Sequence, residues 1–186
     1  PKQTHVSHYH SEKDNESLRF TYTFSEDTEL TGNMNLKLWV SSNEADDMDI
    51  FAGIKKLDRQ GNEVNFPDFN HIEQGQVATG WLRVSHRKLD DEKSTIIQPW
   101  HKHEQELKLK KGEIVPIEIE ILPSSTYFKQ GETLVVVIKG NEIIKGTSSP
   151  GLSTRYEHHE TVNKGHHYIH TGANYDSQLI IPIIPQ

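Results

Sequence analysis

Apolar and polar residues alternate with a period of two over several stretches of the chain, as they do in half-buried β-strands. Residues 18–24 carry a leucine or an aromatic residue at every second position, with polar residues between them. Residues 36–40 repeat this pattern, and residues 117–121 show it most clearly, with three isoleucines separated by two glutamates. We therefore expect a strand at each of these stretches, with its apolar side chains facing a core.

Other stretches complete the expected sheets. Strands are predicted at residues 48–58, 64–66, 81–86, 134–138 and 179–184. The turn at 58–62 contains Gly61, which tolerates the positive φ angles of tight turns. The almost unbroken apolar run at 134–138 indicates a central strand covered on both faces, whereas Pro182 indicates an edge or a bulge.

The overall pattern predicts an all-β protein. No window of ten or more residues has the apolar spacing of an amphipathic helix, and roughly eight to ten strands favour a jelly-roll or related β-sandwich. Residues 1–16 are polar and lack an apolar period, so we expect a linker or arm there and the sandwich domain at 17–186. The connections near 86–112 and 140–170 are long, as functional loops or loops that rest on another domain are.

Composition narrows the possible functions. A chain of 186 residues is enough for one domain, and a mean hydropathy of -0.72 indicates a modest core with long polar loops. The net charge of -7, without a run of Lys and Arg, argues against nucleic-acid binding. No apolar stretch approaches the roughly 20 residues that cross a membrane, and the absence of Cys excludes disulfides and thiolate metal sites. We expect a cytoplasmic protein that binds neither nucleic acid nor membrane.

The search for a catalytic serine gives one weak candidate. A nucleophile elbow needs Gly-x-Ser-x-Gly on a turn between a strand and a helix. The nearest match is the segment 146–151 around Ser148, but Pro150 stands where the second glycine belongs and no helical pattern follows. We interpret the segment as an ordinary loop and expect no catalytic residue in this chain.

Two His-x-His pairs raise the question of a metal site. His8 with His10, and His101 with His103, would each place two imidazoles on one face of a strand, which suits zinc or another transition metal. With Glu106 nearby, the second pair resembles half of a cupin metal site, but the framing glycines and a matching distal histidine are missing. Solvated loop histidines are the preferred interpretation, and a metal-dependent cupin enzyme is the third hypothesis.

Neither the remaining histidines nor the acidic run changes this expectation. In each of the adjacent histidine pairs, at 158–159 and at 166–167, the two side chains would point to opposite faces of a strand. Asp46, Asp47 and Asp49 could supply oxygen ligands to calcium, but carboxylates before a strand are more typical of a turn in which they cap backbone N–H groups. We expect no metal and no cofactor.

The tryptophans suggest the alternative function, a carbohydrate-binding module. A flat aromatic face can stack on a sugar ring, and Trp100 follows Pro99 in a polar loop, where such a face would be exposed. Trp39 and Trp81 lie in predicted strands and are more typical of a core or an interface. An exposed Trp100 beside carboxylates would be the signature of this alternative.

Nine short segments occur in an order that is informative when they are taken together. They are 28–32 (TELTG), 36–42 (LKLWVSS), 49–51 (DIF), 80–87 (GWLRVSHR), 111–113 (KGE), 122–132 (LPSSTYFKQGE), 170–172 (HTG), 175–179 (YDSQL) and 182–185 (PIIP). This series resembles the C-terminal domain of the X-Pro dipeptidyl-peptidases, which also follows the catalytic domain in cocaine-esterase-like (CocE/NonD) hydrolases.

The resemblance implies a jelly-roll β-sandwich of the galactose-binding-like type that carries no catalytic residue and no cofactor. The Ser-Asp-His triad of the family belongs to a preceding α/β-hydrolase domain, and because the chain opens at Pro1 and not at a methionine, we expect that domain upstream. The implied partners are that hydrolase domain of the same polypeptide and, through subunit contacts, a homo-oligomer.

Four residues are our candidates for the contact with the hydrolase domain: Trp81, Arg83, Arg87 and Trp100. The two arginines would alternate on one face of a strand, and arginines buried against a partner need carboxylates. The alternative interpretation is that both arginines are exposed or paired within the domain.

Overall fold

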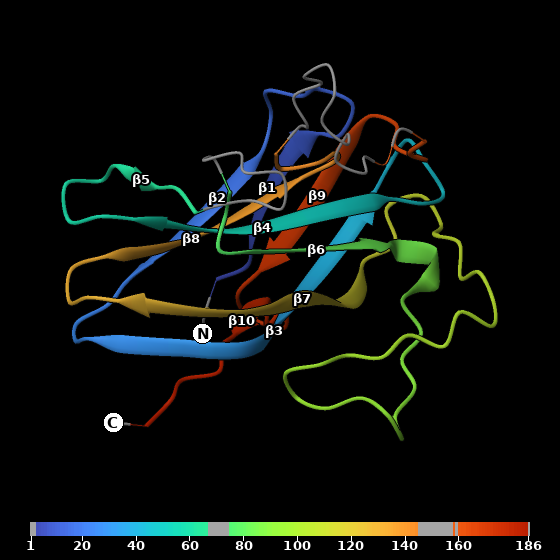
Figure 1. The fold of residues 1–186 in the computed structure, drawn as a ribbon. Coiled ribbons are helices and arrows are strands. Elements are labelled where there is room, and N and C mark those ends of the chain that lie inside the picture. The colour runs from blue at the N-terminus through green and yellow to red at the C-terminus, as the bar shows by residue number, and fades with distance from the viewer. Residues whose placement is uncertain (1–2, 67–74, 145–157, 159, 186) are drawn as a thin grey trace, which may run out of the picture.

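Two antiparallel sheets of five strands each face one another and form a β-sandwich (Figure 1). The structure, a computed structural model, describes residues 3–66, 75–144, 158 and 160–185. The elements are β1 (His5–His10), β2 (Leu18–Thr23), β3 (Thr28–Ser42), β4 (Asp49–Leu57), β5 (Glu63–Val64), β6 (Ala78–Arg83), the 3-10 turn η1 (Val84–His86), β7 (Val115–Phe128), β8 (Thr133–Lys139), β9 (His166–Thr171) and β10 (Gln178–Ile180). The prediction of an all-β sandwich is confirmed. Within the described residues, no helix is long and apolar enough to cross a membrane.

Each sheet is organised around one long strand. In the first sheet β3 pairs with β7 on one side and with β9 and β10 on the other, and β1 extends the sheet beyond β9. In the second sheet β4 pairs with β8 on one side and with β6 and β5 on the other, and β2 extends the sheet beyond β8. At one side of the sandwich β6 and β7 lie against each other across the two sheets. At the other side β2 faces residues of β9 and β10.

The core follows the alternation in the sequence. Ile119 and Ile121 of β7 are fully buried. The alternating Glu118 and Glu120 point outward and accept hydrogen bonds from asparagines of β3. The run of β8 is buried on both faces, as expected, because Val135 turns away from the core and is nevertheless covered. The expected turn at 58–62 also forms, with Gly61 at a φ of 85°.

The N-terminal segment differs from the expected linker or arm. His5–His10 forms β1 and pairs with β9 in direct register, so that Tyr9 lies opposite His167. Only Tyr9 is buried in β1, and the opposite face of the strand carries an exposed valine, Val6, and two histidines. An apolar period of two could not be detected in such a strand, and the same applies to β9, which lies in the connection that was expected to be loop.

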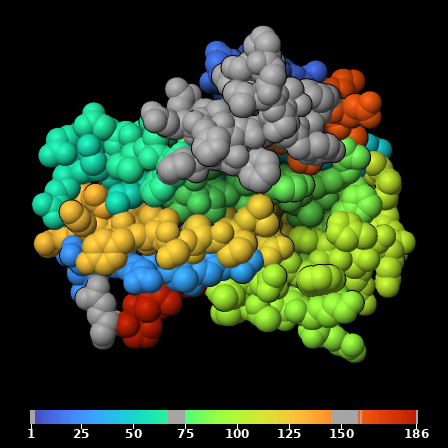
Figure 2. Space-filling model, viewed as in Figure 1, coloured from blue at the N-terminus to red at the C-terminus, as the bar shows by residue number. Residues whose placement is uncertain are grey.

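The strand expected over 81–86 ends early. β6 stops at Arg83, and the chain continues through η1 into a lobe beside the sandwich, formed by the segment between η1 and β7 (Figure 2). Arg83 and Arg87 therefore do not alternate along one strand, and that expectation is wrong. Asp47 stabilises this turn because it accepts a hydrogen bond from the backbone N–H of Ser85, the middle residue of η1. The same oxygen of Asp47 also accepts from the backbone N–H of Met48, just before β4.

Candidate functional site

A surface cleft of about 210 Å³ lies at β4 and β6, and we call it the Trp81 cleft. It is lined by Asp49, Ile50, Phe51, Trp81, Leu82, Arg83, His86, His158 and Glu160. The antiparallel register of β4 and β6 places Trp81 directly opposite Phe51 and Arg83 directly opposite Asp49. Because direct partners share a face of a sheet, this pairing puts an aromatic pair and an ion pair side by side.

Trp81 forms the aromatic wall of the cleft. Its side chain is 47% exposed, while Phe51 opposite it is buried. The imidazole of His158 packs against both rings, with its centroid 5.1 Å from that of Trp81 and 5.4 Å from that of Phe51. His158 is held in this position by Glu142, whose Oε1 lies 2.6 Å from the imidazole Nδ1. The cleft therefore presents one side of a large indole to solvent above a fixed layer of rings.

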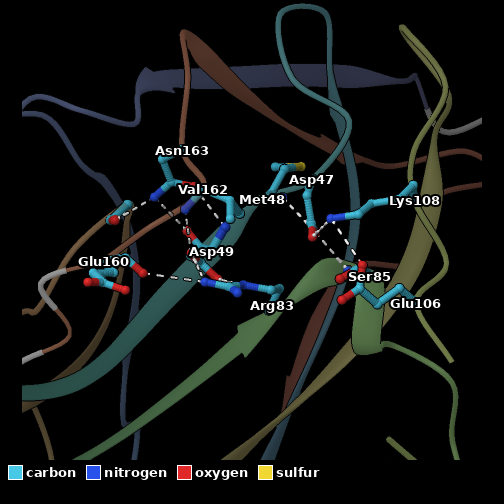
Figure 3. A network of polar contacts seen from close by, with 11 residues as sticks. Asp47, Met48, Asp49, Arg83, Ser85, Glu106, Lys108, Glu160, Val162 and Asn163 are labelled. Atoms are coloured by element: carbon cyan, nitrogen blue, oxygen red, sulfur yellow. Dashed lines mark hydrogen bonds and ion pairs between the residues drawn. The ribbon is translucent and has the colours of Figure 1, made fainter. Parts of the chain in front are cut away.

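A bidentate ion pair between Arg83 and Asp49 borders this aromatic wall. Figure 3 shows the ion pair and its further partners. Arg83 Nε and Nη2 donate to the two carboxylate oxygens of Asp49 at 2.8 and 3.0 Å. The hydrogen bonds to Asp49 outweigh partial burial and raise the pKa of Arg83 above its usual value. Asp49 also accepts from the backbone N–H of Val162 at 2.8 Å, so that its carboxylate is fully engaged. The guanidinium head remains partly exposed beside Trp81 and is held in one orientation.

Asn163 ties the same strand to the segment that supplies His158 and Glu160. Its Oδ1 accepts from the backbone N–H of Asp49 at 2.7 Å, and its Nδ2 donates to the carbonyls of Asp49 and Gly140. These bonds fix the segment from Glu160 to Asn163 against β4 (Figure 3). The cleft is thus made of chain regions that are far apart in the sequence but rigidly connected.

A second polar network lies next to the first and stabilises η1. Asp47 is almost fully buried; besides its two backbone N–H partners it accepts from Lys108 Nζ at 3.0 Å, and Lys108 also contacts Glu106 at 3.4 Å. Burial raises the pKa of the Asp47 carboxyl, but the hydrogen bonds from Ser85, Lys108 and Met48 outweigh it and lower the pKa. The interpretation of the acidic run as a turn with capping carboxylates is confirmed for Asp47.

The four candidate contact residues are only partly brought together. Trp81 and Arg83 line the cleft, whereas Arg87 and Trp100 do not. Arg87 donates within the domain to the carbonyls of Val84 and Leu107, and burial lowers its pKa. Both arginines are therefore paired internally, which was the alternative interpretation.

Trp100 lies in the lobe beside the sandwich. It is 50% exposed, and the ammonium of Lys93 stands 5.7 Å from the centre of its indole ring. Its backbone is fixed by two hydrogen bonds: its N–H donates to Ser94 Oγ at 2.9 Å, and its carbonyl accepts from the N–H of Asp90 at 2.8 Å. Trp100 is thus exposed as expected, with a cation over its ring.

The histidines do not form a metal centre in the part of the chain that the structure describes. Among those residues no group of three or more His, Asp or Glu side chains is arranged to hold a metal ion. His8 and His10 stand beside His166 with ring centroids 5.3 and 5.0 Å apart from it, on the outer face of β1 and β9. Neighbouring His167 points inward and is buried, which confirms that the pair at 166–167 faces opposite ways.

Two sites considered from the sequence fall outside the described residues. These are the loop serine Ser148 and the second histidine of the pair at 158–159. Asp49, the partner of Arg83, was considered only as a calcium ligand; its real role follows from the pairing of β4 with β6, which two adjacent predicted strands could have suggested. No pattern in the sequence indicates that His158 and Glu160 join the cleft.

The fold and the cleft define a β-sandwich domain that presents a fixed aromatic surface with an arginine beside it. The chain belongs to the family of X-Pro dipeptidyl-peptidase C-terminal non-catalytic domains, whose model matches residues 1–180. This agrees with the resemblance seen in the sequence. A search of curated proteins gave no match.

Similar domains occur in solved structures of larger proteins. A CocE/NonD family hydrolase from Staphylococcus aureus is 72% identical with a TM-score of 0.95, over 98% of this chain and 33% of that one. The chain thus spans about a third of the length of this relative. An α-amino acid ester hydrolase (12% identical, TM-score 0.52, 90% and 25% of the two chains) and an aminopeptidase from the marine sediment archaeon Thaumarchaeota archaeon (14%, 0.55, 91% and 26%) share the fold.

Proposed function

We propose that this chain is the non-catalytic domain that docks onto, and supports, the catalytic α/β-hydrolase portion of a serine hydrolase. The observation that carries the proposal is the 72% identity over 98% of this chain to only 33% of a CocE/NonD family hydrolase. The parent protein would cleave an acyl ester or amide, or an X-Pro peptide, through an acyl-enzyme whose nucleophile and base lie in the preceding domain.

The Trp81 cleft is the surface that we propose for this contact. Tryptophan and arginine are the residue types that most often contribute the largest share of binding energy at protein interfaces. Trp81 exposes nearly half of its side chain above rings that hold it in place, and the bidentate bond to Asp49 orients Arg83 before binding. Side chains that are already ordered lose little conformational entropy on association, which favours binding. Trp100 is a second, separate candidate anchor.

A titration tests this surface. The 186-residue chain and the separately produced catalytic portion of the same polypeptide are mixed in a calorimeter, first unmodified and then with Trp81→Ala. Loss of a central aromatic anchor typically costs about 2 kcal/mol, so the Kd should rise about 30-fold. Trp100→Ala is expected to have a smaller effect because Trp100 does not line the cleft.

Tyr127→Ala provides the matched control. Tyr127 is 45% exposed, close to the exposure of Trp81, but belongs to β7 and does not line the cleft. Its replacement should leave the Kd unchanged. Equal effects of Trp81→Ala and Tyr127→Ala would remove the cleft from the interface, and the absence of any binding by the unmodified chain would reject the docking function itself.

Three further features belong to the same proposal. We infer a cytoplasmic location because a chain without Cys suits a reducing compartment. The family resemblance also implies subunit contacts between copies of the parent protein, which sedimentation of that protein would test. It further implies a jelly-roll topology of the galactose-binding-like type, which a solved structure would test.

A further inference from the structure

Strand β2 turns an apolar face toward the opposite sheet, and the described residues leave much of that face uncovered. Its register with β8 places Phe20 opposite Val136 and Tyr22 opposite Leu134. The two β8 residues are buried in the core, yet Phe20 is 37% and Tyr22 58% exposed. The alternation of residues 18–24 therefore gave the correct direction for these side chains, but they stand at the border of the core.

These two aromatic residues form one wall of a groove of about 360 Å³ between the sheets. The opposite wall includes Leu179 and Ile181, and the residues between the walls are mostly aliphatic. The volume lies within the range of sites that enclose ligands, and walls made mostly of carbon select an apolar occupant. The groove and the Trp81 cleft lie at opposite edges of the second sheet. The groove lies at β2, beyond β8, whereas the cleft lies at β6, which pairs with β4 on the side away from β8.

The backbone beside the groove can also accept a partner. Among the described residues β2 pairs only with β8, so its other edge presents N–H and C=O groups that no described strand uses. Exposed edges in natural sheets are usually protected by lysine, proline or a bulge. β2 has the sequence LRFTYT, in which Arg19 is the one charged residue and proline is absent. An open edge next to an apolar groove is the arrangement that accepts an added strand.

The path of the chain indicates where such a strand would come from. Thr171 at the end of β9 lines the groove and pairs with His5. The carbonyl of Gln3 lies directly against Gly172, so the polypeptide that leads into β1 reaches the domain at this end of the groove. A C-terminal domain follows the rest of its protein, and in the staphylococcal hydrolase the similar region is 33% of the chain.

We propose that the groove holds an extended segment of the catalytic portion, added as a strand to the free edge of β2. This inference rests on the proposed function and assigns it a second contact. A segment that matches the six residues of β2 spans about 20 Å, and every second side chain would enter the groove. The segment is therefore apolar at alternate positions, and its backbone bonds to β2.

Hydrogen exchange read by mass spectrometry tests the added strand. The 186-residue chain is labelled alone and again with a saturating amount of the catalytic portion. Amides of residues 18–23 that point away from β8 should exchange at least tenfold more slowly in the complex. Amides of β1, an edge strand of the other sheet whose residues do not line the groove, should change less.

A charge placed in the groove tests the apolar contact. Tyr22→Lys changes a side chain that is 58% exposed, so the domain should keep its fold, while the Kd for the catalytic portion should rise at least tenfold. Val6→Lys is the matched control, because Val6 is 51% exposed on the neighbouring edge strand β1 and does not line the groove. Its Kd should equal that of the unmodified chain.

The outcomes separate this inference from the proposed function. Slower exchange in β2 together with weaker binding by Tyr22→Lys supports the added strand. Binding without any change in β2 exchange, or with equal Kd values for Tyr22→Lys and Val6→Lys, overturns it and leaves the docking function intact. Protection of β2 that grows with the concentration of the chain alone would assign the groove to a second copy and overturn the inference. The absence of binding would reject the docking function together with it.

Discussion

Stability at mildly acidic pH should depend on one buried histidine, His167. Its side chain is fully buried, with Nδ1 hydrogen-bonded to the Tyr9 hydroxyl at 3.0 Å and Nε2 without a hydrogen-bond partner. Burial lowers its pKa from the usual 6.5 to about 3; Asp49 raises it and His10 lowers it further, both to a smaller extent. The imidazole is therefore neutral in the folded protein wherever the protein is folded.

The size and sign of the effect follow from this difference. The unfolded chain takes up a proton on this histidine below about pH 6.5, and the folded protein does not do so until about pH 3. The contribution to stability is complete above pH 6.5 and is lost as the pH falls, by about 1.4 kcal/mol per pH unit. Between pH 7.5 and pH 5 the loss amounts to about 2 kcal/mol.

Urea unfolding of the unmodified chain and of His167→Gln, measured between pH 5 and 7.5, isolates this contribution. Glutamine keeps a hydrogen-bond partner for Tyr9 and does not titrate, so the stability difference between the two proteins should shrink by about 2 kcal/mol as the pH falls to 5. Other titrating groups cancel in the difference. His8→Gln, at an exposed position of β1, controls for the exchange of a histidine for glutamine as such.

The reasoning is refuted if the difference between the unmodified chain and His167→Gln stays constant over this pH range. If His167→Gln does not fold, nuclear magnetic resonance of the unmodified chain gives the same information. The imidazole signals of His167 should remain those of a neutral ring down to pH 4, and a midpoint near 6.5 would contradict its burial as a neutral group.

Three further predictions follow from contacts in the described structure. Asp49→Asn weakens the bidentate bond to Arg83 and should lower the free energy of unfolding by about 2 kcal/mol in urea titrations, whereas no change would show that the pair is solvated. Gly80→Ala would place a Cβ against a backbone carbonyl of β7 and should therefore lower the melting temperature. Gly61→Ala should lower it far less, because a Cβ there meets open space and only the positive φ opposes it. The reverse order would contradict the close approach of β6 to β7. Titration with simple sugars should leave tryptophan fluorescence unchanged, and a saturable change abolished by Trp100→Ala would favour the carbohydrate-binding alternative.

The sequence predicts strands where one face is apolar and the other is charged, or where both faces are apolar. β7 and β8 are of these two kinds, and their burial matches the prediction. β1 and β9 were missed because their buried residues include histidine and tyrosine, which are also common on surfaces. In this pair burial depends on the bond between Tyr9 and His167, 158 residues apart, and a local pattern cannot reveal such a contact.

The candidate site was predicted only in part for the same reason. Exposed Trp81 and Arg83 were selected from a short motif, but the residue that orients Arg83 is 34 positions away and becomes visible only through the register of β4 and β6. Similarly, the alternation in β2 predicted the face on which Phe20 and Tyr22 lie but not how exposed they are. Their exposure depends on how far the opposite sheet extends over them. Periodicity thus assigns a side chain to a face, and the three-dimensional arrangement decides what lies on that face.

Esterase activity is the most direct test of the account. A chromogenic acyl ester is offered to the 186-residue chain alone, to the separately produced catalytic portion of its own polypeptide, and to the mixture. A non-catalytic supporting domain predicts no turnover by the chain alone and higher or longer-lasting turnover by the mixture than by the catalytic portion alone. Turnover by the 186 residues alone would contradict the central claim.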